Sequence, residues 1–290
     1  MRKTICFATA FALSLLLVAC GGQPAGEESV VQKTTQQYDG FRPKTAGIKK
    51  ADSYTEEGIS VSVTDILYED VVTKIGFQLK NETDTPVRVG TANFSINGFM
   101  CTDRLFCEIP ANSEQTSTLE ISNEWFGEMQ IAVIKDMEFV VKVYDIDNNE
   151  IQKSDILKVK TDAPFTYRQK YDDSGFEIYN GNGMKISARL LQKSAHSNDL
   201  ELVFYAENDT DSAISVMSYD VLVNEIPIEP LFVISVGAGK KAVDTMVFYE
   251  SDLKQNNIEH IEKVTARFKA FNERLETIFD TDPVNVPVAQ

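Results

Sequence analysis

Phe77-Gln-Leu-Lys-Asn81-Glu-Thr83-Asp84 recurs 127 residues later as Phe204-Tyr-Ala-Glu-Asn208-Asp-Thr210-Asp211. The same offset relates apolar and turn positions from residue 75 to residue 159 without a gap. Upstream, Gly58 maps to Gly183 at an offset of 125, so the first hairpin loop of the second copy is expected to be two residues longer. Self-similarity at a fixed offset indicates duplication of a module of about 105 residues.

Both copies have the residue pattern of β-strands. The segments Ile59–Val63 and Met184–Ala188 alternate apolar and polar residues with the period of a strand. Asn97-Gly98 is a strong hairpin signal, because both residues tolerate positive φ. Further strands are expected at 72–79, 87–96, 116–121 and 136–145, with repeats at 200–206, 214–223, 241–248 and 263–272. A short helix is expected to begin with Ser251 as its N-cap.

About seven strands per copy predict an immunoglobulin-like antiparallel β-sandwich. The expected fold class is therefore all-β, with two tandem domains at residues 55–162 and 163–290, after a signal peptide and a flexible tether.

The composition narrows the function classes. Of the 290 residues, 28 are basic and 44 acidic, and the net charge is −16. Such a surface repels phosphate backbones, which argues against nucleic-acid binding. With two histidines and four cysteines, the chain has little material for a His-rich metal site or a disulfide scaffold.

The N-terminus has the pattern of a secretory signal. Arg2 and Lys3 precede an apolar run from Ile5 to Val18, which is shorter than the roughly 20 residues of a spanning helix. The following Leu17-Val18-Ala19-Cys20 resembles the lipobox of bacterial lipoproteins. This resemblance implies removal of residues 1–19, a covalent lipid on Cys20 and attachment to the extracytoplasmic face of the cell membrane. The shortened chain keeps 26 basic and 44 acidic residues, a net charge of −18.

Residues 20–54 are expected to form the lipidated cysteine and a disordered tether. They are rich in Gly, Gln, Thr, Ser and Lys and lack hydrophobic periodicity. A flexible coil of this length has a root-mean-square reach of roughly 30 Å.

The two copies also resemble a known group as a whole. The Asn-acid-Thr-Asp turn, the Asn-Gly hairpin and the Ala238–Lys241 segment (Ala-Gly-Lys-Lys) are similar to immunoglobulin-like repeats of lipoproteins from anaerobic Firmicutes. The first copy departs from this pattern, with Ala-Asn-Ser-Glu at 111–114. The resemblance supports fold and location, and it implies no activity.

Cys101 and Cys107 are the remaining cysteines, and they align with Ile228 and Ile234 of the second copy. Apolar counterparts favour two free thiols in the core. A disulfide across the local hairpin is the alternative, provided that the two Cα atoms lie within about 7 Å.

Asp145, Asp147 and Asn149 resemble the opening of a Ca²⁺ loop. The segment departs from the EF-hand pattern, because Glu150 stands where glycine is needed and Ile156 where glutamate is needed. A solvated hairpin turn is the preferred interpretation and a weak calcium site the alternative, so no metal or other cofactor besides the lipid is expected.

Aromatic residues supply the candidate binding surface. Trp125 aligns with Asp252 and is either packed or an exposed contact for a protein or sugar. Tyr167 and Tyr171 lie in the segment between the copies, where they dock that segment onto the second copy or line a ligand groove.

No catalytic constellation is evident, because neither His196 nor His260 stands in a motif with a nucleophile. The sequence therefore predicts a non-enzymatic lipoprotein that interacts with an envelope or extracellular protein or glycan, or serves adhesion or as an accessory envelope module. The alternative is capture of a sugar, peptide or cation. An envelope enzyme or enzyme inhibitor is the third class.

Overall fold

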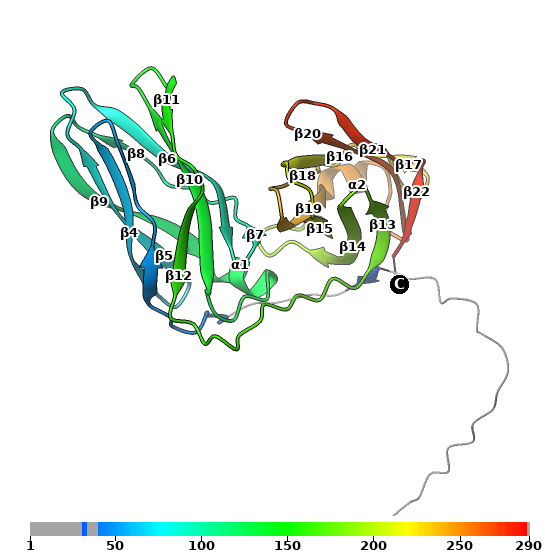
Figure 1. Ribbon diagram of the computed structural model, residues 1–290. Coiled ribbons are helices and arrows are strands. Elements are labelled where there is room, and N and C mark those ends of the chain that lie inside the picture. The colour runs from blue at the N-terminus through cyan, green and yellow to red at the C-terminus, as the bar shows by residue number, and fades with distance from the viewer. Residues whose placement is uncertain (1–30, 34–39, 289–290) are drawn as a thin grey trace, which may run out of the picture.

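The computed structural model describes residues 31–33 and 40–288. Figure 1 shows two groups of strands, which we call the first half (residues 40–162) and the second half (residues 163–288). The elements of the first half are β2 (Ile48–Ala51), β3 (Tyr54–Glu56), β4 (Ile59–Tyr68), β5 (Val72–Asn81), β6 (Val87–Ile96), β7 (Phe99–Met100), β8 (Phe106–Ile109), β9 (Ser113–Ser122), α1 (Asn123–Glu128), β10 (Asp136–Tyr144), β11 (Glu150–Lys153) and β12 (Leu157–Thr161).

The second half repeats this order from β3 onward. Its elements are β13 (Phe176–Gly181), β14 (Met184–Lys193), β15 (Leu200–Asn208), β16 (Ile214–Val223), β17 (Ile226–Pro227), β18 (Val233–Val236), β19 (Lys240–Phe248), α2 (Glu250–Gln255), β20 (Lys263–Asn272), β21 (Thr277–Asp280) and β22 (Val284–Pro287). A further short strand, β1 (Gln32–Lys33), lies upstream of the first half.

In each half, two mainly antiparallel layers of strands enclose an apolar core, and one layer of each half belongs to a single 12-stranded sheet joined by the parallel pair β19–β7. In the first half, the sheet β3-β4-β5-β9 packs against strands β8, β6, β10, β12 and β2. In the second half, β13, β14, β15 and β19 pack against β18, β16, β20, β21 and β22. Alternate residues of most of these strands are buried, as in the pattern of β20. The structure confirms the predicted all-β, antiparallel sandwich class, while the division into two domains at residue 162 stays a prediction.

Strand register repeats along with strand order. Ile75 pairs with Leu119 between β5 and β9, and Leu202 pairs with Met246 between β15 and β19, so both partners shift by 127. The β4–β5 loop spans 69–71 and its counterpart spans 194–199, which places the predicted extra residues there.

The repeated asparagine anchors the same turn in both halves. Asn208 is fully buried, and its Nδ2 donates to the carbonyl oxygens of Ser212, Val236 and Gly237 at 2.8, 3.0 and 3.1 Å. Its Oδ1 accepts from the backbone N–H and the hydroxyl of Thr210 at 3.0 and 2.7 Å. Asn81 makes the equivalent five bonds in the first half. The side chain thus ties the turn to the strand end opposite, which explains why the motif marks the repeat.

The two short helices differ at their N-termini. Ser122 caps α1 by accepting from the backbone N–H of Glu124 at 3.2 Å. The predicted Ser251 cap of α2 is wrong: the helix begins at Glu250, and Tyr249 occupies the cap position without a side-chain bond.

The prediction of a disordered tether is wrong for residues 31–33 and 40–54. Strand β2 pairs with β12, and Tyr54 lies in the first-half core. Upstream, β1 pairs in parallel with β14 of the second half, and the fully buried Val31 belongs to the second-half core. Residues 20–30 and 34–39 lie outside the described residues. Such segments are stabilised by backbone hydrogen bonds to a neighbouring strand, which require no alternation of apolar and polar residues. The sequence pattern therefore did not reveal them.

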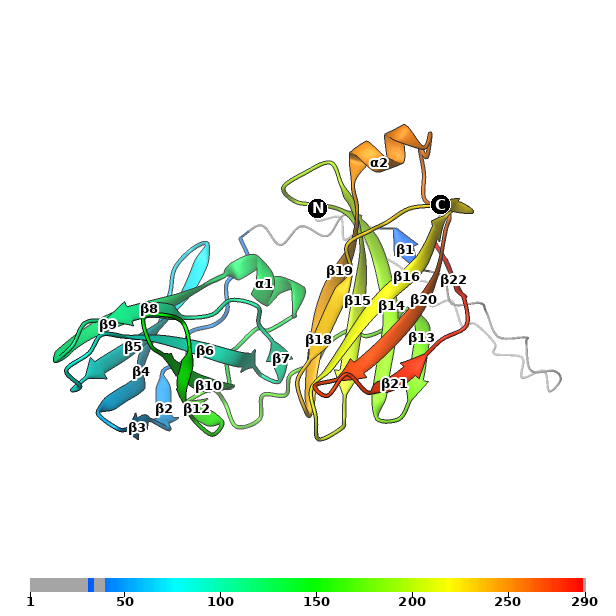
Figure 2. The same ribbon diagram turned by 90° about the horizontal axis from the view of Figure 1, so that it is seen from above.

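The two halves lean apart in a V, joined along the bottom by residues 163–175, and seen from above their strands run in different directions (Figures 1 and 2). At the point of the V, the N–H of Lys241 on β19 donates to the carbonyl of Gly98 at 2.9 Å. Tyr171 of the connecting segment lies between Phe99 and Tyr205, with ring centroids 5.2 Å from each. Tyr205 is on β15, yet it is buried in the first-half core.

Candidate binding cleft

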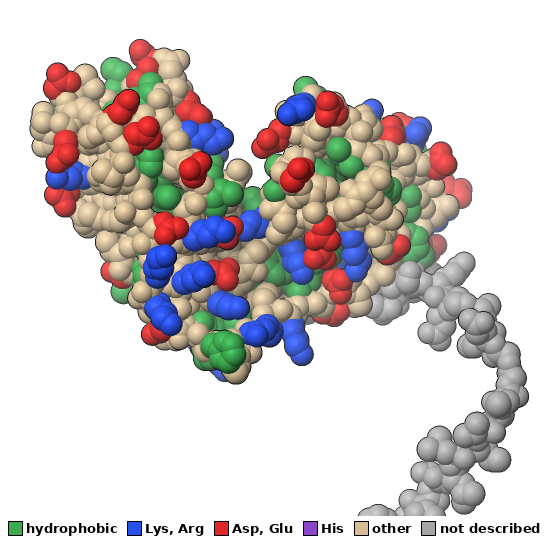
Figure 3. Space-filling model, viewed as in Figure 1, with side chains coloured by type: hydrophobic (Ala, Val, Ile, Leu, Met, Phe, Trp, Pro, Cys, Tyr) green, Lys and Arg blue, Asp and Glu red, His purple; other side chains and the backbone are tan. Residues whose placement is uncertain are grey.

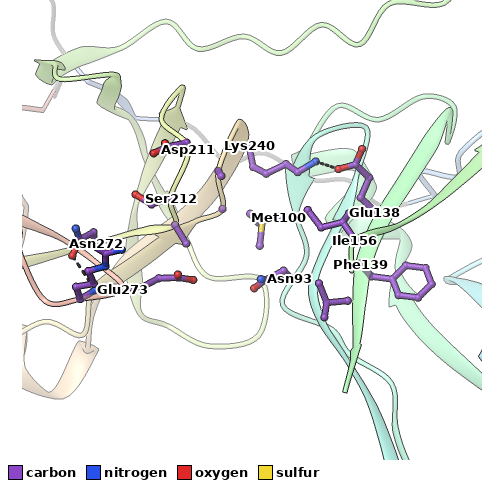
Figure 4. Close-up of a pocket in the computed structure, with 15 residues that line it drawn as sticks. Asn93, Met100, Glu138, Phe139, Ile156, Asp211, Ser212, Lys240, Asn272 and Glu273 are labelled. Carbon is purple, nitrogen blue, oxygen red and sulfur yellow. Dashed lines mark hydrogen bonds and ion pairs between the residues drawn. The ribbon is translucent and has the colours of Figure 1, made fainter. Parts of the chain in front are cut away.

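A cleft opens between the two halves, visible as the V-shaped hollow in Figure 3. The cavity at its base has a volume of about 590 Å³. One wall is formed by β6, β10 and Ile156, and the other by the loops that follow β15, β18 and β20. Figure 4 shows the lining residues Asn93, Met100, Glu138, Phe139, Ile156, Asp211, Ser212, Lys240, Asn272 and Glu273.

An ion pair crosses the cleft. Lys240 Nζ lies 2.5 Å from Glu138 Oε2, and Lys158 Nζ lies 3.2 Å from Oε1 of the same carboxylate (Figure 4 shows the first pair). Burial raises the pKa of Glu138, but hydrogen bonds and charge from Lys240 and then Lys158 outweigh it and hold the pKa below its ordinary value. Glu138 is therefore ionised at neutral pH and fastens the halves together.

A second hollow of about 660 Å³ continues from the cleft along the first half, with Asn93 lining both. It presents an aromatic pair, Phe106 of β8 and Tyr144 of β10, whose ring centroids are 5.9 Å apart. Phe106 is 54% exposed and lies over Gly90, where an added Cβ would approach its ring to 3.1 Å. Glycine at this position lets the ring rest on the sheet.

The sequence prediction missed this pair. Phe106 and Tyr144 come from strands far apart in sequence, and the second copy carries Val233 and Phe271 at the same positions. Both side chains occupy outward positions of their strands, and that alternation was the available signal.

The predicted binding residues Trp125 and Tyr171 line a separate cavity of about 280 Å³ at the point of the V. Trp125 packs partly buried against the first-half core and meets Phe126 edge-on at 5.1 Å. The Tyr171 hydroxyl accepts a hydrogen bond from Arg189 Nη1 at 2.9 Å. The guanidinium carbon of Arg189 lies over the Tyr171 ring, 4.8 Å from its centroid. Both residues therefore hold the junction together.

Tyr167 is not among the residues that line the described cavities. Its hydroxyl donates to Gln169 Oε1 at 2.8 Å, which helps to fix the connecting segment. The predicted docking onto the second copy alone is wrong, because Gln169 bonds to first-half residues and Tyr171 contacts both halves. The three aromatic residues do not form one groove.

Glu128 lines the junction cavity and has an unusual environment. Burial raises its pKa to about 7, with further contributions from Glu201 and Glu124. We expect the free energy of unfolding to fall as the pH rises from 4.5 through 7. Over this range the Glu128 carboxyl is ionised in the unfolded chain, whereas burial keeps it protonated in the folded one.

The Glu128→Gln variant removes this ionisable group. Relative to the unmodified chain, it should unfold at a higher temperature at pH 8 and at a similar one at pH 4, with a gain of about 2 kcal/mol at the higher pH. Differential scanning calorimetry at the two pH values measures this, with the exposed Glu120→Gln as the matched control. An equal shift at both pH values would contradict the assignment.

The calcium alternative at Asp145, Asp147 and Asn149 is not supported by the geometry. Asp145 Oδ1 accepts the backbone N–H groups of Asp147 and Asn149 at 2.9 Å each, and its Oδ2 accepts from Asn149 Nδ2. Asn272 accepts from the equivalent backbone positions in the second half. Within residues 31–33 and 40–288, no group of three His, Cys, Asp or Glu residues is placed to hold a metal ion.

Cys101 and Cys107 are free thiols in the structure, so the disulfide alternative is not formed. Burial raises the pKa of Cys101 to about 12 and also raises that of Cys107. Both are therefore poor nucleophiles at neutral pH.

The histidines lie at the surface. His196 is in the extended β14–β15 loop, 83% exposed in its side chain and 3.7 Å from Glu124. His260 precedes β20 and is exposed. Over the described ranges, neither imidazole is hydrogen-bonded to a hydroxyl or thiol group.

The signal sequence and Cys20 lie outside the described residues. In the described part of the chain, no helix has the length and apolar character needed to cross a membrane.

No family model matches the chain, and no curated protein matches it. Solved structures that resemble it include red sea bream transglutaminase, at 7% identity and a TM-score of 0.24, over 81% of this chain and 32% of that one. The YadV chaperone is 14% identical with a TM-score of 0.23, over 74% of this chain and 92% of that one. An exo-chitosanase of Amycolatopsis orientalis is 11% identical with a TM-score of 0.23, over 82% of this chain and 26% of that one. The chain thus spans about a third of the transglutaminase and a quarter of the chitosanase, and similarity this low carries no functional argument.

Proposed function

We propose that the protein is an exported, lipid-anchored envelope protein that binds a glycan, without chemical conversion, in the cleft between its halves. The lipobox-like sequence at Cys20 supports the anchor. The observation that carries the binding role is the cleft and its continuation, with exposed aromatic rings on one wall.

The chemistry of these walls suits a glycan. Sugars present apolar faces that pack on aromatic rings, and hydroxyl groups that exchange hydrogen bonds with polar side chains. Phe106 and Tyr144 supply the rings, and Asn93, Ser212 and Asn272 supply amides and a hydroxyl nearby. A protein segment is the second candidate ligand, favoured by Ile156, which lines the cleft and is 57% exposed.

One experiment with two variants tests both parts. Cells that produce Phe106→Ala should retain the protein in the membrane fraction but bind labelled cell-surface oligosaccharides at least about tenfold more weakly, since one lost aromatic contact is worth roughly 1.4 kcal/mol. Cells that produce Cys20→Ala should release the protein into the soluble fraction with its oligosaccharide affinity unchanged.

The matched control is Tyr249→Ala, an exposed aromatic residue outside the cleft. Equal oligosaccharide binding by Phe106→Ala and the unmodified protein would overturn the glycan site. Unchanged membrane retention of Cys20→Ala together with unchanged N-terminal processing would overturn the lipid anchor.

A further inference from the structure

The segment that connects the halves presents a phenylalanine to solvent. Phe165 is 83% exposed and sits in a turn closed by the Tyr167 N–H, which donates to the Pro164 carbonyl at 2.8 Å. Arg168 Nη1 donates to the Phe165 carbonyl at 2.7 Å, and its guanidinium lies 5.9 Å from the centre of the ring. The turn is thus ordered and does not cover its largest apolar side chain.

Further cations lie on the strands and loops that adjoin the start of the connecting segment. Lys50 and Lys160 are register partners on β2 and β12, and both are exposed. Lys135 joins them, because its carbonyl accepts from the Thr161 N–H at 3.0 Å. We define the connector face as Phe165 with Lys44, Lys50, Lys135, Lys160, Arg168 and Lys170.

Hydrogen bonds through two amides fix the connecting segment beside these strands. Asn97 Oδ1 accepts from the Lys135 N–H at 2.7 Å, and Asn97 Nδ2 donates to Gln169 Oε1 at 3.1 Å. Gln169 stands between Arg168 and Lys170 in the chain, so its bonds hold the backbone of both cations beside the first half.

The charge on this face is not compensated locally. Over the described ranges, none of its six cations has a carboxylate oxygen within ion-pair distance. Nearby acids include Asp136, the register partner of Lys160, Asp162, which accepts the Gly47 N–H, and Asp52, which accepts the Lys158 N–H. Figure 3 shows Lys and Arg side chains gathered over the lower part of the view, on a chain whose net charge is −16. An excess of cations here indicates an anionic partner.

We infer that the connector face binds the anionic phospholipid headgroups of a bilayer, with Phe165 entering the interface. Basic residues are drawn to anionic headgroups, and apolar side chains such as phenylalanine insert at the boundary between headgroups and acyl chains. The inference rests on the proposed anchoring, which brings the chain to a bilayer, and it adds an orientation. In Figure 3 the V opens toward the top of the view, while Lys and Arg side chains gather below its base, so docking through this lower part leaves the opening of the cleft facing away from the membrane.

The position of β1 agrees with this orientation. Figure 1 places β1 at the lower edge of the second half, on the side of the connecting segment. Cys20 precedes Val31 by 11 residues, which span at most about 40 Å. An anchor at Cys20 therefore keeps that edge near the bilayer.

Vesicle co-sedimentation tests the inference with the chain from residue 21 onward, which keeps every described residue and carries no lipid. It should bind vesicles of phosphatidylcholine mixed with phosphatidylglycerol and bind pure phosphatidylcholine weakly. Each cation near an anionic surface strengthens binding about fivefold. Replacing Lys160, Arg168 and Lys170 with alanine should therefore weaken binding about 100-fold, and Phe165→Ser should weaken it about tenfold.

The matched control replaces Lys153, Lys193 and Lys254, three exposed lysines on other elements, with alanine. Equal loss in the control and the test variant would overturn the connector face. Unchanged binding by Phe165→Ser, together with displacement by soluble polyphosphate, would show a dissolved polyanion as the partner and also overturn it. Oligosaccharide binding should be unaffected in the triple variant, so failure here is distinguishable from failure of the proposed cleft.

Discussion

Asn208→Ala should lower the free energy of unfolding by about 4 kcal/mol. The side chain is fully buried, and its loss leaves the carbonyls of Val236 and Gly237 and the N–H of Thr210 without their partners. Each buried polar group left unpaired costs about 1–3 kcal/mol. Urea unfolding followed by circular dichroism measures the change.

The matched control is Asp211→Ala in the same turn, an exposed residue that should change stability by less than about 0.5 kcal/mol. Because Asn81 makes the same bonds in the first half, Asn81→Ala should cost as much as Asn208→Ala. A large loss for one asparagine and none for the other would show that the two turns are not energetically equivalent.

Tyr205→Gln should open the junction between the halves, with a loss of about 3 kcal/mol. The side chain is buried, stacks on Tyr171 at 5.2 Å and donates from its hydroxyl to Glu207 Oε2 at 2.9 Å. Replacing a large buried aromatic residue with a shorter polar one removes packing that adjacent groups do not refill. Glutamine is the residue at the equivalent position of the first half, Gln78, so the sandwich itself accommodates it.

Two measurements report on the junction directly. Trp125 is the single tryptophan of the chain and lines the junction cavity, so its fluorescence should shift to the red in Tyr205→Gln. The radius of gyration from small-angle scattering should rise. Gln78→Ala is the control and should leave both unchanged. If Tyr205→Gln also leaves both unchanged, other contacts hold the halves together.

Much of the fold was predictable from periodicity and turn chemistry, because burial on one face of a strand imposes an alternation that survives in the sequence. The Asn81 and Asn208 turns and the shared strand order are examples. Periodicity says that alternate residues are buried, and it does not say against which surface. The segment at 40–54 went unrecognised for this reason: β2 is held by backbone pairing to β12, which any residue can provide.

The contact between the two halves could have been predicted by comparing the two copies of the repeat residue by residue. On the outward face of β15, Val203 and Tyr205 stand where β5 has Gly76 and Gln78. The second copy is apolar there because the first half covers that face, whereas β5 faces solvent at Gln78. The cleft was less accessible to prediction, since its walls come from strands and loops that only the angle between the halves brings together.

The placement of Val31 decides how tension would travel through the molecule. Val31 precedes the first half in the chain, yet its side chain is buried in the second half and its N–H donates to the Pro287 carbonyl at 2.9 Å. A pull on the chain upstream of Val31 therefore loads β1 and its neighbour β14 first. While β1 stays paired with β14, little force reaches the first half. The force that the attachment withstands is then set by the shear strength of this short pair of strands.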